Sequence, residues 1–106
     1  MGLQRTVTCP APLPAWPAVL AHLTAAGLPV QMRMIDGQPA FPDEEPPADW
    51  RELRVAAPAG MVTLRRQGQS VAVLVWGNAD AALQSQAADL ARALADLTGG
   101  RIESDD

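Results

Sequence analysis

The spacing of apolar residues along the chain predicts two helices separated by a block of strands. Apolar residues recur at steps of three and four over residues 15–26 and again over residues 79–98, which is typical of a helix with one buried face. Between these segments apolar and polar residues alternate with a period of two, as in half-buried strands. The alternating runs are, in chain order, 30–35, 52–56, 61–66 and 70–76.

The first of these runs ends in a strong turn signal. Asp36-Gly37 suits a type I′ hairpin turn, because both central residues of that turn need a positive φ. The turn would pair Ile35 with Gln38 and begin a return strand. Pro39 and Pro42 keep that return strand short and at a sheet edge, because proline cannot donate to a strand ladder.

Turn chemistry also predicts how the later runs pair. A turn over residues 57–60 places Val55 opposite Val62, and a turn centred on Gln67-Gly68 places Leu64 opposite Val71. Both turns put the same apolar residues on one face of the sheet. A slip of one residue would move each apolar side chain to the other face, so this agreement supports the pairing.

These elements predict an α+β fold, in which a mainly antiparallel four-stranded sheet carries both helices on one face. The order is helix, five strands including the short return strand, then helix, with Asn78 as N-cap of the second helix. Arg101–Glu103 is compatible with one more short strand. The predicted core consists of Val19, Leu20, Leu23, Met32, Leu53, Val55, Val62, Leu64, Val71, Val73, Val75, Leu83, Leu90 and Leu94.

The same pattern divides the chain into three parts. Residues 1–14 are predicted to be a flexible leader, because the prolines that begin at Pro10 oppose regular structure. Residues 15–103 would form a single α+β domain, and residues 104–106 an acidic tail. A length of 106 residues fits one domain rather than two.

Composition narrows the classes of function. Eight Arg, no Lys and 12 acidic residues give a net charge of −4, which argues against nucleic acid or an anionic membrane as the partner. No apolar run approaches the roughly 20 residues that cross a bilayer, and no signal-like segment is evident. The single cysteine, Cys9, cannot form an internal disulfide. The expected location is therefore the cytoplasm.

The residue pattern gives little indication of a catalytic function. His22 is the only histidine and has no nucleophile at a recognisable spacing, so a structural or surface role is expected for it. One Cys and one His do not make a structural zinc site, and no glycine-rich phosphate loop is present. No metal or cofactor is predicted, and an enzyme is the least favoured class of function. No segment carries the signature of a known family.

The face of the sheet opposite the helices is the first candidate site. It would expose Met61, Leu74 and Trp76, with Ile35 extending the cluster. Exposed apolar clusters on a small protein often mark an interface, and Trp and Met are enriched at interface cores. The leading hypothesis is thus a non-enzymatic interaction module that binds itself or another protein. The alternative is that the leader covers this cluster with Leu3 or Val7.

The segment 42–49 is a second candidate, as an acidic loop stiffened by prolines. Its carboxylates, on Asp43, Glu44, Glu45 and Asp49, could contact a basic partner. The other interpretation is a solvated connection between strands.

A third candidate lies at the open end of the hairpin. Arg51 would pair with Arg66 there, with Trp50 as a stacking platform for a small ligand or anion. The competing interpretation is that nearby acidic residues neutralise these arginines.

Overall fold

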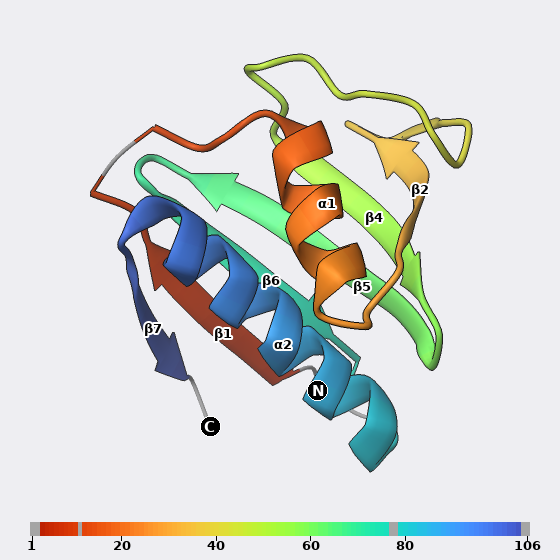
Figure 1. The fold of residues 1–106 in the computed structure, drawn as a ribbon. Coiled ribbons are helices and arrows are strands. Elements are labelled where there is room, and N and C mark those ends of the chain that lie inside the picture. The colour runs from red at the N-terminus through yellow and green to blue at the C-terminus, as the bar shows by residue number, and fades with distance from the viewer. Residues whose placement is uncertain (1–2, 11, 77–78, 105–106) are drawn as a thin grey trace.

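An antiparallel sheet with helices on one of its faces makes up the protein (Figure 1). The computed structural model describes residues 3–10, 12–76 and 79–104. Within these residues the strands are β1 (Leu3–Thr8), β2 (Gln31–Ile35), β3 (Gln38–Pro39), β4 (Glu52–Ala57), β5 (Gly60–Gln67), β6 (Ser70–Val75) and β7 (Arg101–Ser104). The helices are α1 (Trp16–Ala25) and α2 (Ala81–Thr98). The strand order is β3-β2-β4-β5-β6-β1-β7, and each neighbouring pair is antiparallel.

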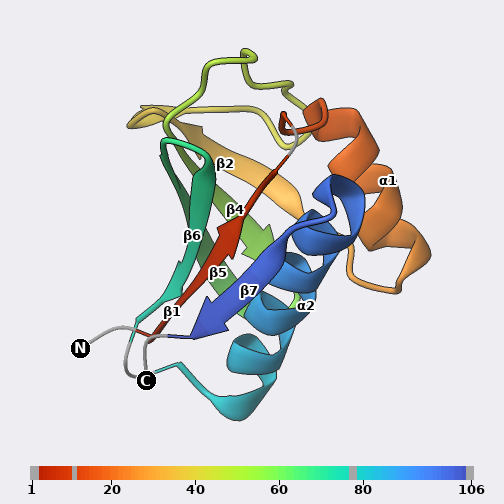
Figure 2. The same cartoon turned by 90° about the vertical axis from the view of Figure 1, so that its left-hand side faces the viewer.

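Both helices lie on the same side of the sheet, as predicted (Figure 2). In Figure 1, α1 lies in front of β4 and β5, while α2 lies in front of β6 and β1. The predicted core residues lie between these layers and are buried, apart from Leu20 and Leu83, which are half-buried. Val7, Trp16 and Trp50 also belong to the core, although the predicted core set did not include them.

The four-stranded sheet is a wrong prediction, because the described residues form a sheet of seven strands. The largest error concerns the leader. Residues 3–8 are not a flexible segment but strand β1, which pairs with β6 on one side and β7 on the other. The inward positions of β1 include Arg5, opposite Val73, so the apolar alternation is interrupted. The prolines that suggested a leader begin only after β1 has ended.

The helix ends follow from local capping chemistry. The carboxylate of Asp80 accepts a hydrogen bond from the Leu83 amide at 2.8 Å, so Asp80 is the N-cap of α2. The predicted cap, Asn78, lies outside the described residues, and α2 begins two residues later than the predicted 79. At the other end, Gly99 adopts a φ of 71°, the left-handed conformation that commonly ends a helix.

Two of the predicted strand pairings are confirmed. Ile35 pairs with Gln38 across the Asp36-Gly37 turn, whose residues have φ values of 50° and 82°. Val55 pairs with Val62 in the β4–β5 ladder.

The β5–β6 pairing differs from the prediction by two residues. Leu64 lies opposite Val73 instead of Val71, since Gln67 pairs with Ser70 and the turn is centred on Gly68-Gln69. The φ of Gly68 is 61°, and a glycine with positive φ at the first central position is typical of a type II′ turn. A shift of two keeps each side chain on its predicted face.

In the described part of the chain, no helix is both long and apolar enough to span a membrane.

Candidate functional site

The face of the sheet opposite α1 and α2 carries an exposed apolar cluster. We call this face of the sheet the open face. Its residues include Gln4, Thr6, Arg54, Met61, Thr63, Arg65, Leu74 and Trp76. Trp76 is 69% exposed and Met61 40%, while Leu74 is half-buried. The other tryptophans, Trp16 and Trp50, are each 7% exposed. A tryptophan side chain therefore remains on the surface although the protein has a core that buries two others.

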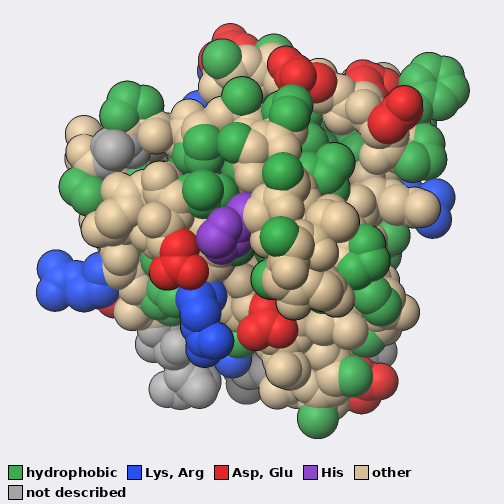
Figure 3. Space-filling model, in the orientation of Figure 1, with side chains coloured by type: hydrophobic (Ala, Val, Ile, Leu, Met, Phe, Trp, Pro, Cys, Tyr) green, Lys and Arg blue, Asp and Glu red, His purple; other side chains and the backbone are tan. Residues whose placement is uncertain are grey.

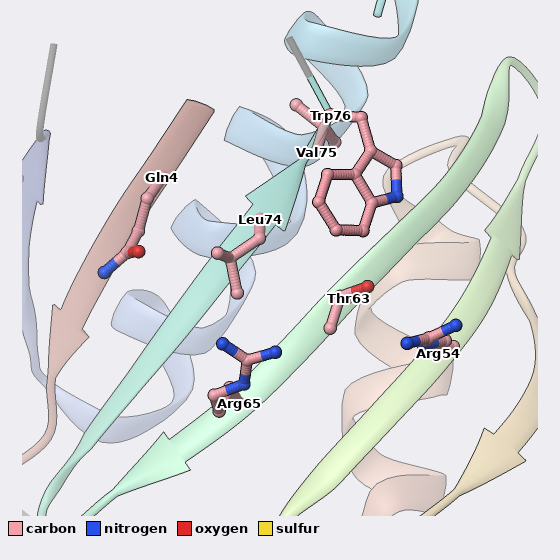
Figure 4. A pocket seen from close by; sticks show the side chains of 7 residues that line it. All are labelled: Gln4, Arg54, Thr63, Arg65, Leu74, Val75 and Trp76. Atoms are coloured by element: carbon pink, nitrogen blue, oxygen red, sulfur yellow. The ribbon is translucent and has the colours of Figure 1, made fainter. Parts of the chain in front are cut away.

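A hollow of about 220 Å³ lies on the open face beside Trp76, and we call it the Trp76 hollow. It is lined by Gln4, Arg54, Thr63, Arg65, Leu74, Val75 and Trp76. Figure 4 shows the indole ring of Trp76 at one end, Leu74 and Thr63 in the middle, and Arg54 and Arg65 around the rest, with α1 and α2 behind the strands. The hollow thus combines an apolar centre with a cationic rim.

The carboxylate of Glu52 lies between the two rim arginines. Glu52 Oε1 is 3.6 Å from Arg54 Nε and 3.8 Å from Arg65 Nη2. These separations exceed those of hydrogen bonds, so both guanidinium groups keep donors for another acceptor. All three side chains are partly exposed, and surface ion pairs of this kind contribute little to stability.

Ile35 does not belong to the open face, contrary to the prediction. The β2–β4 ladder has an irregularity between Met32 and Met34, which places Met34 opposite Arg54 and Ile35 opposite Leu53. Leu53 is fully buried in the core, and Ile35 packs against the core as well. A bulge inserts one extra residue into a strand and so reverses the face of the residues that follow it. Met34 therefore takes the open-face position predicted for Ile35.

The alternative in which Val7 of the N-terminal segment covers the cluster is wrong. Val7 is 0% exposed and lies in the core, because residues 3–8 are a strand of the sheet itself. The side chain of Gln4 instead lines the Trp76 hollow. Gln4 could be assigned to this site only once β1 was known to pair with β6.

The acidic loop, residues 42–49, lies at the surface between β3 and β4. Its four carboxylate residues are all exposed, and acidic side chains gather at the top of Figure 3, where this loop lies. Directly before the loop, Phe41 is 74% exposed. The Phe41 amide donates to Glu44 Oε1 at 3.1 Å, and the Glu44 amide donates to the Phe41 carbonyl at 3.0 Å. These bonds hold an exposed phenyl ring next to the carboxylates, a feature that the sequence interpretation missed.

At the third candidate site, the Trp50/Arg51/Arg66 end of the hairpin, the aromatic ring is buried. Trp50 is part of the core, and the guanidinium carbon of Arg66 lies 4.4 Å from the centroid of its ring. Arg66 Nη1 also donates to the Ala48 carbonyl at 3.0 Å. Arg66 thus contacts Trp50 in a cation–π arrangement, so the ring face that was predicted to stack on a ligand lies against a side chain of the protein.

At the end of the hairpin that carries Arg51 and Arg66, a carboxylate of the same chain already accepts hydrogen bonds. Asp36 Oδ1 accepts hydrogen bonds from the amides of Arg51 at 2.7 Å and Glu52 at 2.9 Å. The hydrogen bonds from the Glu52 and Arg51 amides, with the charges of Arg51 and Arg66, hold the pKa of Asp36 below its ordinary value of 3.8. These observations do not favour an external anion at this end.

We expect Asp36 to make stability pH-dependent in acid. A lowered pKa in the folded state means that its contribution is complete above about pH 4 and is lost as the pH falls through the folded value. The free energy of unfolding of Asp36→Asn should therefore differ most from wild type near neutral pH, and the difference should close in acid. Urea titrations of both proteins between neutral pH and about pH 2 test this. A difference that does not change with pH would contradict it.

The remaining residues with catalytic potential lie apart from one another. His22 Nε2 is 3.8 Å from Asp96 Oδ2 on the surface between α1 and α2, whereas Cys9 is buried and its Sγ donates to the Val7 carbonyl at 3.7 Å. Across residues 3–10, 12–76 and 79–104, no group of three or more His, Cys, Asp or Glu side chains is arranged to hold a metal ion. The structure does not bring these residues together as a catalytic set.

The Trp76 hollow is assembled from residues of four strands, β1, β4, β5 and β6, and from Trp76 directly after β6. An exposed indole can stack or pack, and the guanidinium groups of Arg54 and Arg65 can bind carboxylates. The arginines were evident in the sequence, but their proximity to Trp76 depends on the β5–β6 pairing. Comparison of the chain with protein-family models, with curated proteins and with solved structures finds no match.

Proposed function

We propose that this protein is a non-enzymatic interaction module that associates with a second copy of itself through the open face. The observation that carries this proposal is the exposure of Trp76 and Met61 on a sheet face that neither helix nor β1 covers. Apolar clusters on such a face commonly mark protein interfaces. Tryptophan in particular is enriched among the residues that contribute most to binding.

The dimensions of the Trp76 hollow favour a protein partner over a small ligand. Small-molecule sites typically enclose roughly 300–1,000 Å³ and bury most of the ligand. This hollow measures about 220 Å³ and lies open on a sheet face, so it suits a single large side chain of a partner. Its cationic rim complements an acidic partner, and the chain itself has a net charge of −4.

The substitution Leu74→Glu is expected to convert the associated protein into a monomer. It places a carboxylate in the middle of the hollow, where contact with a second copy would remove that charge from water. Sedimentation at micromolar concentrations measures the change in molar mass. Trp76→Ser should have the same effect with less risk to folding, because Trp76 is 69% exposed.

The matched control is Leu97→Glu. Leu97 is 37% exposed on α2, in the other layer, so the same chemical change there should leave association intact. Acrylamide quenching gives an independent measurement, because Trp16 and Trp50 are buried and Trp76 dominates the accessible fluorescence. Wild-type protein that is monomeric at micromolar concentration, with Trp76 fully quenched, would refute the proposal.

A further inference from the structure

We infer that the part of the second copy that occupies the Trp76 hollow is the acidic loop, with Phe41 inserted next to Trp76. This inference rests on the proposed function and names the element that binds. It joins the two surface features that the described fold leaves without a role, the cationic hollow on the open face and the acidic segment that follows Phe41.

Charge is the first reason for this assignment. Arg54 and Arg65 border the hollow, and their contacts with Glu52 are too long to be hydrogen bonds, so carboxylates of a partner can bind them. The acidic loop presents exposed carboxylates on Asp43 and Glu45. Two open faces stacked directly on one another would instead bring arginines near arginines, which is unfavourable.

Shape and apolar contact are the second reason. Phe41 and Trp76 are the two most exposed large apolar side chains among the described residues, at 74% and 69%. A hollow of about 220 Å³ has room for one phenyl ring beside the indole. Aromatic pairs of this kind stabilise a contact beyond the effect of the area they bury. The Glu44 hydrogen bonds with Phe41 hold the phenylalanine in a defined turn, which reduces the entropy lost on binding.

The fold holds Phe41 of a chain away from its own Trp76. Phe41 lies beside β2, since the Met32 amide donates to the carbonyl of the next residue, Pro42, at 3.1 Å. Strands β2, β4, β5 and β6 are consecutive in the sheet, so three strand spacings of roughly 4.8 Å, or about 14 Å, separate β2 from β6. We therefore place the contact between two molecules.

Complementation between two defective variants tests the inference. The loop variant carries Phe41→Ser and Glu45→Lys, and the face variant carries Trp76→Ser and Arg54→Ser. All four side chains are exposed, so the fold should be retained, which circular dichroism can verify. The control variant, Leu97→Ser with Asp89→Lys, makes similar changes on α2.

We expect each defective variant to be monomeric alone, because each lacks one half of the loop-to-hollow contact. An equimolar mixture should form a one-to-one complex, since the face variant keeps an intact loop and the loop variant keeps an intact hollow. This complex should weaken as salt is raised, because the contact includes carboxylate–guanidinium pairs. The control variant should associate as wild type does.

Other outcomes separate this inference from the proposed function. If the loop variant associates like wild type while the face variant is monomeric, the open face is an interface but its occupant is not the acidic loop. If both variants are monomeric and their mixture forms no complex, the loop does not bind the hollow. If the face variant associates like wild type, the proposed function fails together with this inference.

Discussion

Replacing Val7 with Asp is expected to unfold most of the protein. Val7 is 0% exposed and pairs with Val71 and Ile102 within the sheet, so a carboxylate there would be surrounded by core side chains. Uncompensated buried charges typically cost about 3–5 kcal/mol, a large part of the stability of a small domain. Urea denaturation followed by circular dichroism gives the change in the free energy of unfolding.

The matched control is Thr8→Asp, one residue further along the same strand. Thr8 is exposed, so a carboxylate at that position stays in water and should change stability by less than about 0.5 kcal/mol. The comparison tests the largest correction to the sequence interpretation. If residues 3–8 were a loose leader, the two substitutions would have equal and small effects.

Gly100→Ala is expected to detach β7 from β1. A Cβ atom at Gly100 would overlap the carbonyl oxygen of Thr8 and lie 2.9 Å from Thr98 Oγ1. The Thr98 hydroxyl is itself held by a 2.7 Å hydrogen bond to the Leu94 carbonyl, so neither neighbour can move freely. Overpacking of this kind costs about 1–3 kcal/mol, and we expect the upper end because one clash is with backbone.

Gly99→Ala provides the contrast at the adjacent position. Gly99 has a φ of 71° but open space where its Cβ would lie, so the cost there is backbone strain of roughly 1–2 kcal/mol without a clash. Amide hydrogen exchange separates the two mechanisms. Protection of β7 amides should be lost in Gly100→Ala and kept in Gly99→Ala, and retained protection in Gly100→Ala would contradict the steric argument.

The open-face residues that were predicted correctly follow from rules that act between neighbouring residues of the chain. Alternation placed Leu74 and Trp76 on the face opposite Val73, and the turn over residues 57–60 gave the correct β4–β5 pairing. These inferences depend on residues close together in the chain. Their physical basis is the two-residue period of a strand and the φ values that a turn requires.

The errors arose where the decisive contact is distant in sequence or leaves no local signal. The β2 irregularity between Met32 and Met34 exchanged Ile35 for Met34 on the open face, and no glycine marks it. The β5–β6 pairing moved by two residues because Gly68 occupies the first central position of its turn instead of the second. The predicted and the observed β5–β6 registers satisfy the same apolar alternation, so only the folded backbone distinguishes them.

The helices, the strands from β2 to β6 and the apolar face could be recognised from amino-acid order, because propensity, periodicity and capping act over a few residues. The place of β1 could not, because its inward-facing Arg5 interrupts the pattern and its stability comes from pairing with β6 and β7. The Trp76 hollow depends on that placement. Gln4 and Leu74 are 70 positions apart in the chain, and they line one site only because long-range backbone hydrogen bonds set β1 beside β6.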